Sequence, residues 1–141
     1  MKRRRRNILI GLAVVLVVFF VIFPLRFPHS EAQILQDHLG LTNSSAFPNI
    51  RTHFLALSEW TAWIYLEGNA SDIQRLLDEQ RYVPDSSNQS SETLRQVTFQ
   101  KAPSPPSPAE ARFFCRHDPG IDEQAVVSPG GTQLWLRAAR Y

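Results

Sequence analysis

The sequence predicts an α+β protein in which an N-terminal transmembrane helix precedes a small antiparallel sheet of four to six strands with one or two packed helices. Three observations predict this class: an uncharged apolar run near the N-terminus, two amphipathic segments with helix start signals, and several short stretches of alternating apolar residues. A length of 141 residues suits one small domain with an extra segment.

The apolar run comes first in the chain. Ile8–Phe23 carries no charge and is apolar on every face, which does not suit the core of a small domain. Extended to Leu25, the run would make a helix of about 27 Å, close to the hydrocarbon thickness of a bilayer. Residues 7–25 are therefore predicted to form a transmembrane helix, with the lipid bilayer as partner.

A basic cluster precedes this run within residues 1–6. It consists of Lys2, Arg3, Arg4, Arg5 and Arg6. The positive-inside rule places such a cluster in the cytoplasm and the C-terminal body outside it. The expected location is a cell membrane, with a bacterial inner membrane favoured by the compact layout.

A cleaved secretory signal peptide is the alternative, because it has the same basic, apolar and polar order. Ser30-Glu31-Ala32 is the one small-x-small cleavage candidate, and Arg5-Arg6 also suggests a twin-arginine signal. A retained anchor is favoured because the run is longer than a usual signal core. Residues 30–33 also form a better helix cap than a cleavage site.

The charge of the body differs from that of the N-terminus. From Phe27 onward there are nine basic and thirteen acidic residues, so the formal net charge of +2 comes from the N-terminus. Because nucleic-acid binding needs a clustered positive face, no nucleic-acid partner is expected. Cys115, the single cysteine, cannot form an internal disulfide and is expected to be a buried strand residue.

Residues 26–50 are predicted to form a connector that contains a short helix. Ser30 and Gln33 have capping-box spacing, and Gly40 is a natural stop. Ile34, Leu35 and Leu39 fall on one face of this helix, which gives it an apolar side to bury.

Residues 51–141 are predicted to be the extracytoplasmic domain. One or two strands are expected up to Gly68, with a bulge or turn near Ser58-Glu59. A helix follows over residues 70–82. Its expected capping box joins Ser71 and Gln74, and its expected core residues are Ile73, Leu76 and Leu77.

The remainder is predicted to be strands and loops. A strand over 93–100, through Leu94, Val97 and Phe99, lies between flexible loops near 84–93 and 101–109. The second loop is proline-rich and is expected to be a stiff surface segment. Three further strands follow as a meander, joined at 118–120 and 128–132 by turns with proline second and glycine third.

No catalytic, metal or cofactor site is predicted. Cys115, His117 and Asp118 lie close in sequence, but they supply too few ligands for zinc and no oriented nucleophile–base pair. The adjacent acidic pairs Asp78-Glu79 and Asp122-Glu123 have diverging side chains and are expected on solvated faces. His29, His38 and His53 are dispersed.

Aromatic residues supply the candidate interaction surface. Its predicted members are Trp60, Trp63, Tyr65 and Trp135. Alternating strands direct some of these rings outward, and exposed aromatics suit an interface. The competing interpretation, which the composition favours, is that the rings pack in the core.

The layout resembles that of uncharacterised bacterial single-pass membrane proteins with a small extracytoplasmic α+β domain. The shared features are a strand, the G-x-x-x-D-I-x-x-L-L pattern at residues 68–77 and the final strand at residues 134–141. The expected function is a non-catalytic contact with an unidentified membrane or extracytoplasmic protein. The alternatives are binding of a small ligand or envelope component and, third, an enzyme.

Overall fold

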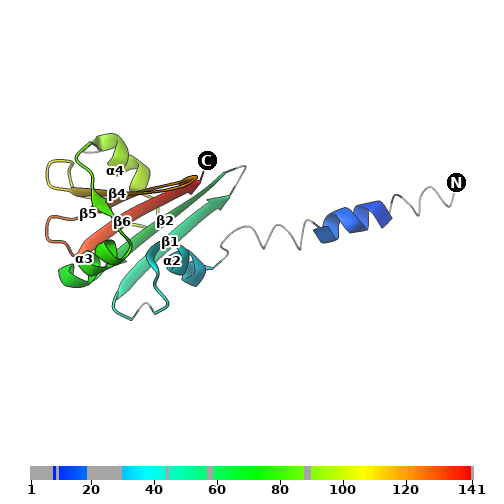
Figure 1. Ribbon diagram of the computed structural model, residues 1–141, viewed down its shortest axis with the longest axis horizontal. Coiled ribbons are helices and arrows are strands. Elements are labelled where there is room, and N and C mark those ends of the chain that lie inside the picture. The colour runs from blue at the N-terminus through cyan, green and yellow to red at the C-terminus, as the bar shows by residue number, and fades with distance from the viewer. Residues whose placement is uncertain are drawn as a thin grey trace.

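The computed structural model describes residues 8, 10–18, 30–43, 45–56, 59–87 and 90–140. It confirms an α+β domain built on one antiparallel sheet of six strands, in the order β1-β2-β6-β5-β4-β3 (Figure 1). Six strands is the upper limit of the predicted number.

The helices are short and the strands are mostly seven or eight residues long. The helices with defined bounds are α2 (Glu31–Leu39), α3 (Ala70–Glu79) and α4 (Ser91–Val97). The strands are β1 (Asn49–Ala56), β2 (Trp60–Glu67), β3 (Val83–Pro84), β4 (Arg112–Asp118), β5 (Ile121–Val127) and β6 (Gln133–Arg140).

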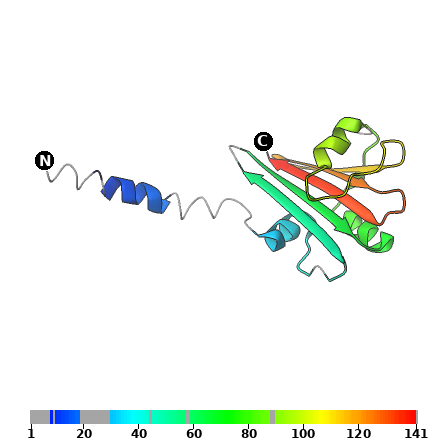
Figure 2. The same ribbon diagram turned by 180° about the vertical axis from the view of Figure 1, so that it is seen from behind.

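Two local hairpin systems build the sheet. β1 and β2 pair as sequence neighbours, and β4, β5 and β6 form the predicted meander. The last strand, β6, then lies between β5 and β2, so it joins the two systems (Figure 2). This arrangement leaves β1 and the two-residue β3 at the edges of the sheet.

Both faces of the sheet are covered. One core cluster packs α2 and α3 onto alternate residues of the strands, such as Ile64 of β2 and Leu136 of β6. The second cluster lies on the opposite face, where α4 covers Tyr65 and Trp135. The prediction of one or two helices on one face therefore misses α4, which is a further helix and packs on the opposite face.

The α2 helix confirms its predicted caps. Ser30 Oγ accepts a hydrogen bond from Gln33 N at 3.2 Å. Gly40 adopts φ = 64°, and its N–H donates to Gln36 O, which ends the helix in the left-handed conformation that glycine favours. Ile34, Leu35 and Leu39 are all buried, as their spacing predicts.

The predicted cap of α3 is wrong by two residues. Asn69, not Ser71, is the N-cap, and its side chain makes no capping bond to the backbone. Ser71 lies in the first turn, and Gln74 donates to Asp78 Oδ1 at 3.0 Å instead of reaching back. The apolar face is correct, because Ile73, Leu76 and Leu77 are buried.

The predicted strand over 93–100 is wrong, because Ser91–Val97 forms α4. Leu94 and Val97 are three residues apart, which fits one helical face rather than the alternation of a strand. Ser90 Oγ accepts from Thr93 N at 3.2 Å and caps the helix start. Part of the loop predicted near 84–93 therefore belongs to this helix.

The meander turns differ from each other. Gly120 has φ = 76° as the third residue of the Asp118–Ile121 turn, which agrees with the predicted type. In the next turn the positive φ, 75°, falls on Gly131 and not on Gly130. Gly131 N donates to Ser128 O at 2.9 Å, so glycine occupies the fourth position there.

The N-terminal predictions fall partly outside the described residues. Residues 8 and 10–18 are helical, and none of the helices that the structure describes combines the length and apolarity needed to cross a bilayer. The predicted span over 7–25 extends beyond these residues, and Lys2–Arg6 lie outside the described residues altogether.

Candidate functional site

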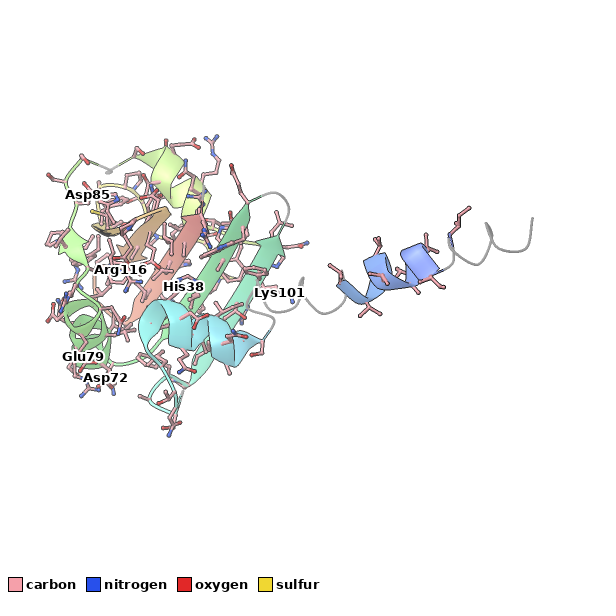
Figure 3. The ribbon with its side chains drawn as sticks, turned by 45° about the vertical axis from the view of Figure 1, so that its right-hand side comes forward. His38, Asp72, Glu79, Asp85, Lys101 and Arg116 are labelled. Carbon is pink, nitrogen blue, oxygen red and sulfur yellow. The ribbon has the colours of Figure 1, made fainter. Side chains whose placement is uncertain are left out.

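A buried carboxylate, Glu123, contacts polar groups from three other parts of the domain. Its side chain is 1% exposed. His38 Nδ1 lies 2.8 Å from Oε1, and Tyr82 OH donates to Oε2 at 2.9 Å. Arg116 Nε forms an ion pair with Oε2, but the angle between them does not meet hydrogen-bond geometry. These four residues are called the Glu123 cluster below; Figure 3 labels His38 and Arg116.

Each member reaches the cluster through regular local structure. Arg116 and Glu123 are directly opposite in the β4–β5 pairing, so their side chains point to the same face. His38 is one turn after Ile34 on the buried face of α2. Tyr82 follows α3, and its ring lies beneath the Arg116 guanidinium, 5.1 Å from its centroid.

Sequence reasoning missed this cluster. Asp122 and Glu123 do diverge, but divergence on a strand directs one of them inward, and Glu123 shares its face with Ala125 and Val127. The expectation that both are solvated is therefore wrong for Glu123. The sequence did contain a signal for His38. It is four residues after Ile34 and therefore lies on the same, buried face of the helix.

The electrostatics of the cluster favour an ionised Glu123. Burial raises the pKa of this carboxyl, but the His38 hydrogen bond, the Arg116 charge and the Tyr82 hydroxyl lower the pKa more, so it lies below 4.5. Burial is the main cause that raises the pKa of Tyr82 well above 10, and the Glu123 charge adds to it. Tyr82 is thus a neutral donor to a charged acceptor.

A pocket of about 250 Å³ opens beside the cluster. Its lining joins α2 to β2, β4, β5 and β6 and comprises Asp37, His38, Trp60, Arg116, Asp118, Ile121, Glu123 and Arg140. This lining contains no serine, threonine, cysteine or lysine to act as a nucleophile. The contacts within the cluster instead fasten α2 to the sheet, because His38 binds a strand that is 85 positions later in the chain.

The predicted aromatic surface is mostly interior. Tyr65 and Trp135 are opposite each other in the β2–β6 pairing and are 0% and 1% exposed. Trp60 is 9% exposed and lies on the other face of the sheet. Trp63 is half-buried, and its indole N–H donates to Gln96 O at 2.9 Å. The four rings therefore do not form one exposed patch.

The residues around the single cysteine do not converge. Cys115 is buried on β4, and desolvation together with the Asp85 carboxylate raises its pKa. His117 is exposed and lies 3.2 Å from Asp122, while Asp118 lies 3.3 Å from Arg116. Within the part of the chain that the structure describes, no three His, Cys, Asp or Glu residues could hold a metal ion.

The two edges of the sheet are protected to different degrees. β3 is two residues long and ends in Pro84, which has no N–H to offer a further strand. β1 has eight residues, no proline and one charged residue, Arg51. No other strand among the described residues pairs with the outer edge of β1, which is the outermost strand in Figure 2.

No protein-family model matches the chain, and the searches of curated proteins and of solved structures found no significant match. The Glu123 cluster and the β1 edge are therefore interpreted from their own geometry.

Proposed function

We propose that this chain is a single-pass membrane protein with its N-terminus in the cytoplasm and a non-catalytic interaction domain outside. The observation that carries the proposal is the β1 edge. Both faces of the sheet are covered by helices, and the β3 edge is short and ends in proline. β1 has eight residues, and no other strand of the described residues pairs with its outer edge, so it is a ready template for another strand.

Exposure of the N-terminal helix supports the anchor. The large apolar side chains described between residues 8 and 18 are 47–65% exposed to solvent, and no charged side chain lies among them. Apolar surface on this scale is unfavourable in water and favourable in lipid. The Lys2–Arg6 cluster supports the proposed orientation in a bacterial inner membrane.

Binding of a small ligand or an envelope component is the second candidate. A hollow of about 430 Å³ beside β3 and β4 favours it, because ligand pockets usually measure about 300–1,000 Å³. Its lining includes Phe113, Phe114 and Arg112. Native mass spectrometry of the purified chain would show a bound non-protein mass if this candidate were correct.

The test uses the full-length chain with a C-terminal tag in membranes. The intact mass and resistance to alkaline extraction report on the anchor. A photoreactive residue at position 52 reports on the β1 edge, with position 79, exposed on α3, as the matched control. We expect an uncleaved mass, retention in the membrane and a protein crosslink from position 52 only.

Two results would contradict the proposal in different parts. A soluble chain lacking about the first thirty residues would overturn the anchor, because signal peptides are removed at that length. Equal crosslinking from positions 52 and 79, or none from either, would overturn the interaction role of β1.

A further inference from the structure

We infer that the occupant of the β1 edge is β1 of a second copy of this chain, paired antiparallel about a two-fold axis at Thr52. This inference rests on the proposed interaction role of the edge and specifies its partner. The two sheets would then continue as one, and the contact would be isologous, as in most homodimers.

The side chains of β1 complement themselves in this register. With Thr52 opposite Thr52 of the second copy, Ile50 lies opposite Phe54 of that copy, and vice versa. Threonine pairs and pairs of aromatic with β-branched residues are favourable across strands. These three residues share the face that α2 covers, since they are opposite Ile64, Leu66 and Ala62 of β2.

The other face of β1 brings Arg51 of one copy opposite His53 of the second. Both side chains are exposed on the same face of the strand. This pair forms twice in the dimer, and it is the place where charge controls the strength of the contact.

The contrast between the two sheet edges supports a role of β1 in pairing with another strand. A long edge without proline promotes uncontrolled pairing unless it is covered, and β3 shows a protected edge in the same sheet. Anchoring would also confine the copies to one membrane plane with a common orientation, which raises their effective concentration.

The first experiment is disulfide trapping in membranes. The variant T52C is oxidised beside L55C, on the same strand, and E79C, on α3; Leu55 and Glu79 are both exposed. We expect T52C to form a covalent dimer at least about tenfold faster than either control, because only residues at the two-fold axis come within disulfide distance of their own copies. The unsubstituted chain, whose single Cys115 is buried, is expected to form no covalent dimer on oxidation.

The second experiment measures dimer dissociation for H53E and H53K in detergent. Both variants remove the ring contacts of His53 with Trp63 and Phe99, so they are matched in folding and differ in charge. We expect H53E to tighten the dimer and H53K to weaken it by about fivefold each, the effect of two cross-strand charge pairs opposite Arg51.

Equal yields from T52C and L55C, or the same shift for H53E and H53K, would overturn the second copy as occupant. If position 52 then still crosslinks to a protein of another mass, the proposed function stands with a different partner. If position 52 crosslinks to nothing, the proposed function fails with this inference.

Discussion

Glu123 shows how a single buried charge can organise distant segments of a small domain. Its carboxylate contacts α2, the segment after α3 and β4, and it lies on β5. Removing one partner of a buried ion pair leaves the others without compensation, which costs far more than losing an exposed pair. The stability of the α2 attachment therefore depends on this one residue more than on any surface charge pair.

We predict that Glu123→Gln lowers the free energy of unfolding by about 3 kcal/mol, because Arg116 loses its buried counter-charge and His38 loses a carboxylate as its hydrogen-bond partner. Asp122→Asn is the matched control, since Asp122 pairs at the surface with the exposed His117, and such a pair contributes at most about 0.5 kcal/mol. Urea unfolding in micelles, followed by tryptophan fluorescence, measures both. Equal effects of the two substitutions would mean that the cluster does not hold α2.

The pH dependence of stability provides a second test of the same residue. The pKa of Glu123 is lowered on folding, so its contribution is present above the unfolded value near 4.5 and is lost as pH falls through the folded value. We predict that the difference in melting temperature between the natural chain and Glu123→Gln shrinks as pH falls below about 4.5. A difference that widens in acid would contradict the lowered pKa.

At the scale of helices and strands, the sequence predicted the features that depend only on neighbouring residues. The caps and apolar face of α2, the hairpin strands and the meander follow from spacing and turn residues. α4 did not, because two apolar residues on a seven-residue helix give too short a pattern to separate period 3.6 from period 2. The position of β6 beside β2 depends on packing of the whole sheet, which no local pattern contains.

The start of α4 offers a test with two adjacent serines. Ser90 Oγ accepts from Thr93 N, whereas Ser91 is the first helical residue and is exposed. We predict that Ser90→Ala lowers the free energy of unfolding by about 1 kcal/mol, the usual value for an N-cap. Ser91→Ala should change it by less than about 0.5 kcal/mol. Reversal of this order in urea unfolding would contradict the cap at Ser90.

The proline-rich segment is fastened to the sheet rather than lying free on it. Trp135 Nε1 donates to Pro103 O at 2.8 Å, and Arg51 donates to Lys101 O. We predict that Trp135→Phe, which removes one donor but keeps an aromatic ring, speeds tryptic cleavage after Lys101. Trp63→Phe is the matched control, because its indole bonds to Gln96 O instead. Faster cleavage in both variants would indicate general loosening.

At the scale of the whole molecule, two features could not be predicted from the sequence: the burial of the aromatic residues and the open edge of β1. Aromatic content indicated an interface, but Tyr65 and Trp135 face each other across neighbouring strands under α4, which only the topology reveals. The open edge of β1 has no sequence signal of its own, because an edge strand and a paired strand share the same alternation. Its asymmetry with β3 becomes visible only when the strand order is known.

Orientation in the membrane is the part of the proposed function that concerns the chain as a whole, and the basic cluster is expected to set it. We predict that replacing Lys2–Arg6 with glutamine gives a mixture of orientations, because the positive-inside rule acts through cations close to the span. Protease protection of the C-terminal domain in sealed vesicles measures the fraction on each side. The matched control replaces five exposed basic residues far along the chain with glutamine and should keep one orientation: Arg75, Arg81, Arg95, Lys101 and Arg112. One unchanged orientation in both variants would show that the cluster does not determine topology, and translocation of the folded body would have to do so instead.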